Sequence, residues 1–263
     1  MSRPALARLA GALILATIAL PAVAADDPDP AVTPYRPSVS SPAALSTPGW
    51  VEMETGGLYA RGPDAHSSRF SVPLTLKLAF TPDLGVVLGG EAWVRDVTPG
   101  PYGEAKGRGD TTLVLKQRFG LDEHRAFGLE LGTKFPTAAQ GVGSGERDWS
   151  ANGIYSADVG EAWHTDVNLN ETLLGAPGRL PPAWQAGWAA SLSRSLNDDW
   201  GAVGELSGTR VTGEKGTVQV LFAGSYNASK AAVLDFGFAK GMNRITPHAQ
   251  VFVGGTFRLG RLF

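Results

Sequence analysis

The sequence of 263 residues contains no cysteine, so neither disulfide bonds nor thiolate metal sites contribute to its fold. Charged residues make up 18% of the chain, and the formal net charge of -2 gives no basic excess that would favour binding to nucleic acid. Beyond the N-terminus no run of about 18 apolar residues occurs, so no later segment is predicted to cross a membrane as a helix. The 34 glycines favour an all-β protein with many turns.

Residues 1–24 have the pattern of an export signal peptide. Two arginines precede an apolar stretch from Leu9 to Leu20, and Ala22-Val23-Ala24 supplies a small-x-small cleavage site. The apolar stretch is too short for a transmembrane anchor. The following residues, 25–48, are rich in Pro, Asp, Ser and Ala without any period, which predicts a flexible periplasmic extension.

From residue 49 to 263 the sequence alternates between apolar and polar residues. Between Phe70 and Phe80 the apolar residues occupy even positions, while polar residues such as Thr75 and Lys77 occupy the odd ones. Period two over about eleven residues is typical of a tilted strand that crosses a bilayer. Twelve such strands are predicted, at 50–60, 69–80, 84–95, 110–119, 127–135, 149–157, 162–171, 184–193, 200–209, 217–226, 231–239 and 250–263.

The predicted connections alternate between short and long, as they do between the periplasmic turns and extracellular loops of outer-membrane barrels. Aromatic residues gather at the strand ends on both sides, as in interfacial girdles. They are Phe80, Phe119, Phe127, Trp163, Trp200 and Phe263 on the short-turn side, and Tyr59, Phe70, Phe135, Trp149 and Trp184 on the long-loop side. The prediction is therefore an all-β transmembrane, antiparallel up-and-down β-barrel of about twelve strands, with both ends of the barrel domain in the periplasm.

A soluble sandwich or a lipocalin-like barrel is the structural alternative, and it would turn its apolar face inward. Twelve strands enclose a space too wide to fill with Leu and Val, and the second face carries charges of both signs. That face is predicted to line a polar lumen, which consists of Glu52, Glu54, Arg69, Lys77, Glu91, Arg95, Lys116, Arg118, Glu130, Lys134, Asp166, Glu205, Asp235 and Arg258. The mixed signs predict salt bridges across a lumen narrow enough for side chains and the N-terminal segment to fill largely.

A few residues do not follow this division. Glu171, Arg194 and Arg261 fall on the lipid face, but near strand ends, where a charge costs about 0–1 kcal/mol. Trp93 falls on the lumen face, which the pattern does not explain.

His164 and Asp166 share one face of a predicted strand. They are either a hydrogen-bonded pair in the lumen or part of a metal or acid–base site. The first interpretation is favoured, because the chain has only four histidines and no ligand cluster is visible in the sequence. Gly107-x-Gly109 precedes a strand rather than a helix, which argues against phosphate binding. No catalytic residue, metal site or cofactor is predicted.

Several short motifs occur in a characteristic order. The segment 35–44 contains Arg36-Pro37 and Ser41-Pro42-Ala43, and the first strand begins Trp50-Val51-Glu52-Met53-Glu54-Thr55-Gly56. Gly107-Arg108-Gly109-Asp110 opens a later strand, and Lys134-Phe135-Pro136-Thr137 precedes Gly143-Ser144-Gly145. Together they resemble the outer-membrane transporter family named for the MetA pathway of phenol degradation. The resemblance implies a pore or transport role, for small apolar or aromatic molecules, without catalytic residues. Phe263 resembles the C-terminal aromatic assembly signal of outer-membrane barrels.

The sequence therefore predicts an outer-membrane channel or transporter that reaches the bacterial outer membrane through the periplasm. Its expected partners are outer-membrane lipid, the barrel-assembly machinery and a small-molecule solute, with no nucleic acid. Two alternatives stay open. One is an outer-membrane lipid hydrolase of the phospholipase or lipid A deacylase type, which needs a nucleophile beside a histidine at the outer rim. The other is a purely structural barrel.

Overall fold

The computed structural model describes residues 29–64, 66–99, 103–175 and 183–263, so the predicted signal peptide at 1–24 lies outside the described residues. The described chain contains thirteen strands. They are β1 (Trp50–Arg61), β2 (Ser68–Ala79), β3 (Leu84–Val97), β4 (Glu104–Gly107), β5 (Thr111–Gly120), β6 (Arg125–Phe135), β7 (Asp148–Val159), β8 (Trp163–Leu174), β9 (Ala183–Ser195), β10 (Trp200–Val211), β11 (Thr217–Ser229), β12 (Ala232–Gly241) and β13 (Ala249–Arg261). Among the described residues, no helix has the length and apolar character needed to cross a membrane.

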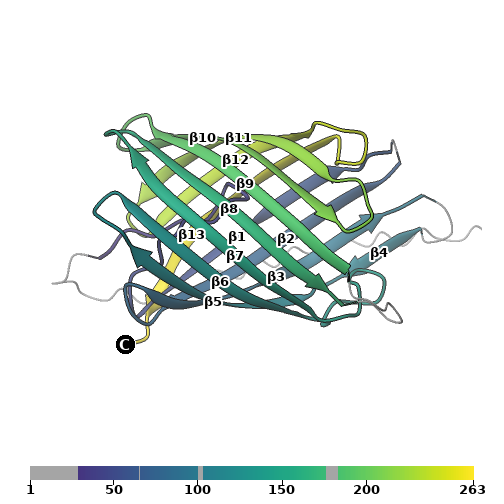
Figure 1. The fold of residues 1–263 in the computed structure, drawn as a ribbon, viewed down its shortest axis with the longest axis horizontal. Coiled ribbons are helices and arrows are strands. Elements are labelled where there is room, and N and C mark those ends of the chain that lie inside the picture. The colour runs from purple at the N-terminus through teal and green to yellow at the C-terminus, as the bar shows by residue number, and fades with distance from the viewer. Residues whose placement is uncertain (1–28, 65, 100–102, 176–182) are drawn as a thin grey trace, which may run out of the picture.

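Twelve of the strands form a closed antiparallel barrel in chain order (Figure 1). The first and last strands close it, with a ladder that runs from Trp50↔Arg261 to Arg61↔Ala249. The predicted twelve-stranded up-and-down barrel is therefore confirmed. The extra strand, β4, pairs only with the end of β3 and lies within residues 96–109, which the sequence pattern assigned to a loop.

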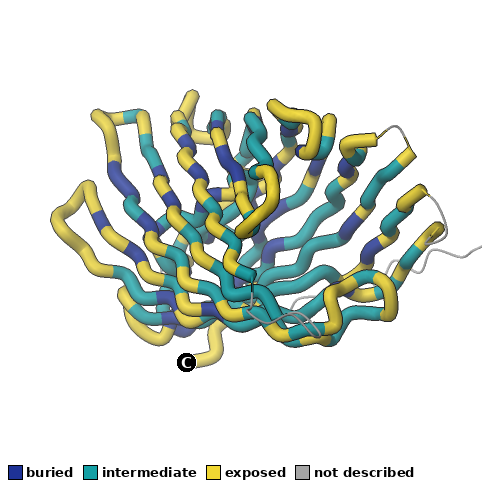
Figure 2. The backbone as a smooth tube through the Cα atoms, turned by 45° about the vertical axis from the view of Figure 1, so that its right-hand side comes forward, coloured by how far each residue is buried: buried dark blue, intermediate teal, exposed yellow. Residues whose placement is uncertain are grey.

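The barrel is apolar outside and polar inside. On β5, Leu113 and Leu115 are 42% and 46% exposed, whereas the adjacent Lys116 is fully buried. The same alternation of exposed and buried residues runs along most strands (Figure 2). Exposed leucines around a buried lysine are favourable only if the outer surface faces lipid rather than water. The burial pattern thus supports a membrane barrel over a soluble one.

The two ends of the barrel differ as predicted. Tight turns join β2–β3, β5–β6, β7–β8, β9–β10 and β11–β12 at one end, which we call the short-turn end. The longer connections and β4 lie at the other, the long-loop end, opposite the C-terminus (Figure 1). Of the eleven predicted girdle aromatics, all are exposed except Phe135, which is half-buried.

Three residues of β3 lie on the opposite side of the barrel wall from the one predicted, because a β-bulge precedes them. Val72 pairs with Trp93 and Pro73 with Glu91, so Ala92 is an extra residue that reverses the alternation beyond it. Val94 is therefore buried and not lipid-facing, while Trp93 is on the exterior, packed against Phe70 at 5.8 Å between ring centroids. Arg95, predicted to line the lumen, is likewise on the outer side and pairs with Glu104 of β4.

Candidate functional site

Residues 29–48, which we call the lumen segment, lie inside the barrel. Its backbone bonds to side chains of strands far apart around the ring, including Glu52 on β1, Glu205 on β10 and Ser156 on β7. A segment reaches all of these inward-facing groups only from within the lumen. The composition-based prediction of a flexible periplasmic extension does not describe these residues, because strand side chains supply the hydrogen-bond partners that the segment lacks on its own. The alternative that the N-terminal segment occupies the lumen matches the structure.

The lumen segment ends in a tight turn into β1. Gly49 has a φ of +81°, in the left-handed region that favours glycine. A Cβ atom there would lie 2.4 Å from the Phe263 carbonyl oxygen. The Leu262 N–H donates to the Gly49 carbonyl oxygen at 2.7 Å, which ties this turn to the end of the last strand.

Glu205 holds the middle of the lumen segment. Its Oε2 accepts the backbone N–H groups of Val39 and Ser40, each at 2.8 Å, and lies 3.0 Å from Ser40 Oγ. Both Glu205 and Ser40 are buried. A buried carboxylate is stabilised by such convergent donors, so Glu205 and this part of the segment depend on each other.

Tyr35 lies between two buried lysines. Lys77 Nζ is 4.2 Å and Lys116 Nζ is 3.9 Å from the centre of its ring. Lys77 also forms ion pairs with Glu52 at 3.0 Å and Glu54 at 2.6 Å. The ring therefore separates two like charges and gives each a cation–π contact in a site from which water is largely excluded.

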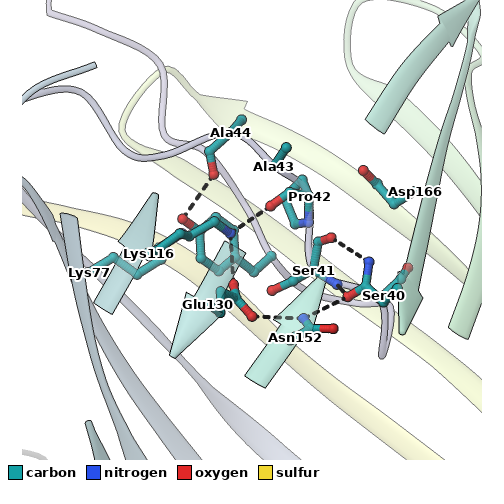
Figure 3. Close-up of polar contacts among 12 residues, drawn as sticks. Ser40, Ser41, Pro42, Ala43, Ala44, Lys77, Lys116, Glu130, Asn152 and Asp166 are labelled. Carbon is teal, nitrogen blue, oxygen red and sulfur yellow. Dashed lines mark hydrogen bonds and ion pairs between the residues drawn. The ribbon is translucent and has the colours of Figure 1, made fainter. Parts of the chain in front are cut away.

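A chain of polar contacts leads from Lys116 along the inner wall of the barrel (Figure 3). Lys116 Nζ donates to the Pro42 carbonyl oxygen at 2.6 Å and pairs with Glu130 at 3.0 Å. Glu130 accepts from Asn152 Nδ2 at 2.9 Å, and Asn152 Nδ2 lies 3.2 Å from Asn168 Oδ1. These contacts join β5, β6, β7 and β8 to the lumen segment.

The fourteen residues predicted to line the lumen fall into four groups. Seven bond directly to the lumen segment: Glu52, Glu54, Lys77, Lys116, Glu205, Asp235 and Arg258. Glu130 and Asp166 lie one contact further away, through Lys116 and Ser156. Nearer the barrel ends, Arg69 pairs with Glu91, Lys134 with Asp148, and Arg118 with Asp83. Arg95 alone lies on the outer side.

Sequence reasoning missed the residues of the lumen segment itself, chiefly Tyr35, Arg36 and Ser40. One signal was available. Glu205 and Asp235 are predicted to face inward, yet the residues opposite them on neighbouring strands are uncharged. A buried carboxylate needs a partner, and here Arg36 and the backbone of the lumen segment supply it.

His164 is a hydrogen-bonded member of an aspartate cluster near the short-turn end. Its Nδ1 lies 2.7 Å from Asp158 and its Nε2 lies 3.2 Å from Asp166. Both ring nitrogens are thus engaged by carboxylates. Within the described residues, no group of three or more His, Asp or Glu side chains has the geometry of a metal site.

Two cavities of about 360 Å³ each lie on opposite sides of the lumen segment. The one toward the long-loop end, the long-loop chamber, is lined by Val39 of the segment together with Asn152, Gln219 and Gln250. The one toward the short-turn end, the short-turn chamber, includes the ionisable Arg36, His164 and Asp166. The chain's own N-terminal region therefore lies between these two cavities.

No protein-family model matches the sequence, and no curated protein matches it. Solved structures resemble the fold. The COG4313 outer membrane channel from Pseudomonas putida F1 has a TM-score of 0.65 at 13% identity, over 82% of this chain and 97% of that one. The NanC porin has a TM-score of 0.58 at 9% identity, over 78% and 98%. The KdgM porin has a TM-score of 0.55 at 10% identity, over 78% and 98%.

The fold is that of outer-membrane β-barrel channels and porins. At these identities the likeness extends to the fold alone. The resemblance to the family named for the MetA pathway stays a prediction.

Proposed function

We propose that this protein is a channel of the bacterial outer membrane for small molecules, and that its lumen segment restricts passage. The observation that carries the proposal is the lumen segment itself, held inside a closed barrel with a chamber on either side. A purely structural barrel has no need of separate compartments. Passage through this lumen requires the segment to shift.

Small apolar or aromatic molecules are the proposed solutes, as the family resemblance implies. The inner wall gives some support. Leu221, Ala239 and Phe252 form a buried apolar cluster, against which Leu58 and Val203 pack. These residues alternate with exposed ones on their strands, so the patch lies inside the barrel. Leu221, Ala239 and Phe252 are only 3–9% exposed, so this patch would contact an apolar solute once the lumen segment shifts.

Strong ion selectivity is not expected. Most inward-facing charges are paired, as in Lys77 with Glu52 and Glu54, Lys134 with Asp148, and Arg69 with Glu91. Paired charges of both signs leave no ring of one sign to select ions. The reversal potential in a salt gradient should therefore lie near zero.

Single-channel recording of the refolded chain from residue 25 onward, in planar bilayers, tests the proposal. The wild type should give small, infrequent openings. Glu205→Gln should open more often, because an amide holds the backbone N–H groups of Val39 and Ser40 less strongly than a carboxylate does. Glu171→Gln is the matched control, because Glu171 is an exposed residue on the outer face of β8 and does not contact the lumen segment. This variant should behave as the wild type.

Two results would contradict the proposal. One is the absence of current and of solute uptake in both wild type and Glu205→Gln. The other is hydrolysis of bilayer lipid by the purified barrel, which would favour the enzyme alternative.

A further inference from the structure

The long-loop chamber differs chemically from the rest of the lumen. None of the fifteen described residues that line it has an ionisable side chain. Amides and hydroxyls are its main polar groups, contributed by Asn152, Asn168, Asn170, Ser207, Thr209, Thr217, Gln219, Thr246 and Gln250. On the other side of the lumen segment, the short-turn chamber contains two arginines, a histidine and an aspartate.

The amides of the long-loop chamber retain hydrogen-bonding capacity. Gln250 Nε2 donates to Gln219 Oε1 at 2.7 Å, and Gln219 Nε2 donates to Ser207 Oγ at 3.2 Å. A primary amide has two N–H donors and an oxygen acceptor, so one contact leaves Gln250 with a second donor and its own oxygen. Donors and acceptors therefore stand side by side on one wall.

Asn152 adds an acceptor that the protein leaves unused. Its Nδ2 donates to Glu130, but its Oδ1 is buried and has no hydrogen-bond partner among the described residues. A buried acceptor without a partner is unfavourable, and because this oxygen has almost no accessible surface, the amide must rotate before a solute in the chamber can donate to it.

From this chemistry we infer that the long-loop chamber binds a small uncharged solute that carries hydroxyl or amide groups. A charged solute would give up hydration without meeting a counter-charge. A purely apolar solute would leave the amides unpaired. The volume of about 360 Å³ is near the lower end of ligand sites, which suits one ring, such as a hexose or a phenol. This inference rests on the proposed channel function, because solutes must enter the barrel to reach the chamber.

Two pairs of solutes, matched in size within each pair, test separately whether the solute must be uncharged and whether it must form hydrogen bonds. Isothermal titration calorimetry of the folded chain in detergent compares glucose with glucuronate, which tests charge, and phenol with toluene, which tests hydrogen bonding. Glucose should bind roughly tenfold more tightly than glucuronate. Phenol should bind about 2- to 10-fold more tightly than toluene, because one additional hydrogen bond changes the affinity by about that factor. The affinities for glucose and phenol are then compared, and the tighter of the two shows whether the solute is a saccharide or a hydroxylated aromatic.

Gln250→Leu removes hydrogen-bonding groups from the chamber and should weaken glucose or phenol binding about 2- to 10-fold, with toluene unaffected or improved. Gln185→Leu is the matched control. Gln185 is a half-buried residue of β9 that does not line the chamber, so this variant should bind as the wild type does. If Gln250→Leu does not fold, the binding of the two solute pairs to the wild-type protein still tests the inference.

Equal binding within both pairs, or tighter binding of glucuronate or toluene, would overturn the inference. This outcome is distinct from failure of the channel proposal. A protein that conducts in bilayers but shows no preference in calorimetry is a channel without this site. One that shows the preference but never conducts has the site and is not a channel.

Discussion

Arg36 and Asp235 form a two-point ion pair inside the barrel. Arg36 Nε lies 3.0 Å from Asp235 Oδ2, and Arg36 Nη2 lies 2.8 Å from Asp235 Oδ1. The pair joins the lumen segment to β12, and the Asp235 side chain is only 3% exposed. Arg36 also lies 5.9 Å from the ring centre of Phe252, so its guanidinium is fixed by an ionic and an aromatic contact together.

Asp235→Ala should leave the Arg36 guanidinium without a counter-charge. Removal of one partner of a buried ion pair lowers the free energy of unfolding by about 3–5 kcal/mol. The same removal from a pair that is partly exposed lowers it by less. Two changes are expected, a lower midpoint in urea unfolding from lipid vesicles and a higher open probability in planar bilayers. Arg95→Ala breaks the exposed pair with Glu104 and serves as control, with an expected effect of about 0–1 kcal/mol. Equal effects of the two variants would contradict an interior position for Asp235.

Tyr35→Ala should release the lumen segment near its start. Without the ring, Lys77 and Lys116 lose their shared cation–π partner and repel each other across the cavity that remains. We expect larger or longer openings in bilayer recordings. Tyr35→Phe keeps the ring and loses only the hydrogen bond to the Ala44 carbonyl oxygen, at 3.0 Å, so it should cost about 1 kcal/mol or less and change conductance little. A large effect of both variants would assign the role to the hydroxyl instead.

The orientation of β2 predicts opposite responses at two adjacent positions. Leu74 is on the outer face, and Thr75 lines an inner cavity together with Glu54 and Glu130. Leu74→Arg should cost about 2–4 kcal/mol in a folding titration in lipid vesicles, because it places a charge in the bilayer. Thr75→Arg should cost much less, since two carboxylates lie nearby. The reverse order would place the polar face against lipid.

The loop lengths predict which end of the barrel faces the cell exterior. A cysteine at Ser144, exposed at the long-loop end, should react with a membrane-impermeant thiol reagent on intact cells. A cysteine at Asp198, in the turn between β9 and β10, should react only after the outer membrane is opened. The native chain contains no cysteine, so the background is clean. Labelling of Asp198→Cys alone would show an inverted barrel.

The sequence alone determined the barrel and the facing of most of its residues. Side chains alternate strictly along a strand, so the positions of Leu74 and Thr75, or of Leu115 and Lys116, follow from the pattern without knowledge of neighbouring strands. The strand count follows from the same pattern, and the two distinct ends follow from the alternation of short and long connections.

Only the tertiary structure decided where that local rule fails. The bulge at Ala92 is visible in the pairing of β2 with β3 and not in β3 alone, so the sequence pattern of β3 by itself places Trp93 and Arg95 on the wrong side. The place of residues 29–48 was also set by tertiary contacts. Their partners Glu205 and Asp235 lie 165 or more residues further along the chain. A segment without regular structure has no period that reveals such partners, because its conformation is fixed by the barrel around it and not by its own backbone.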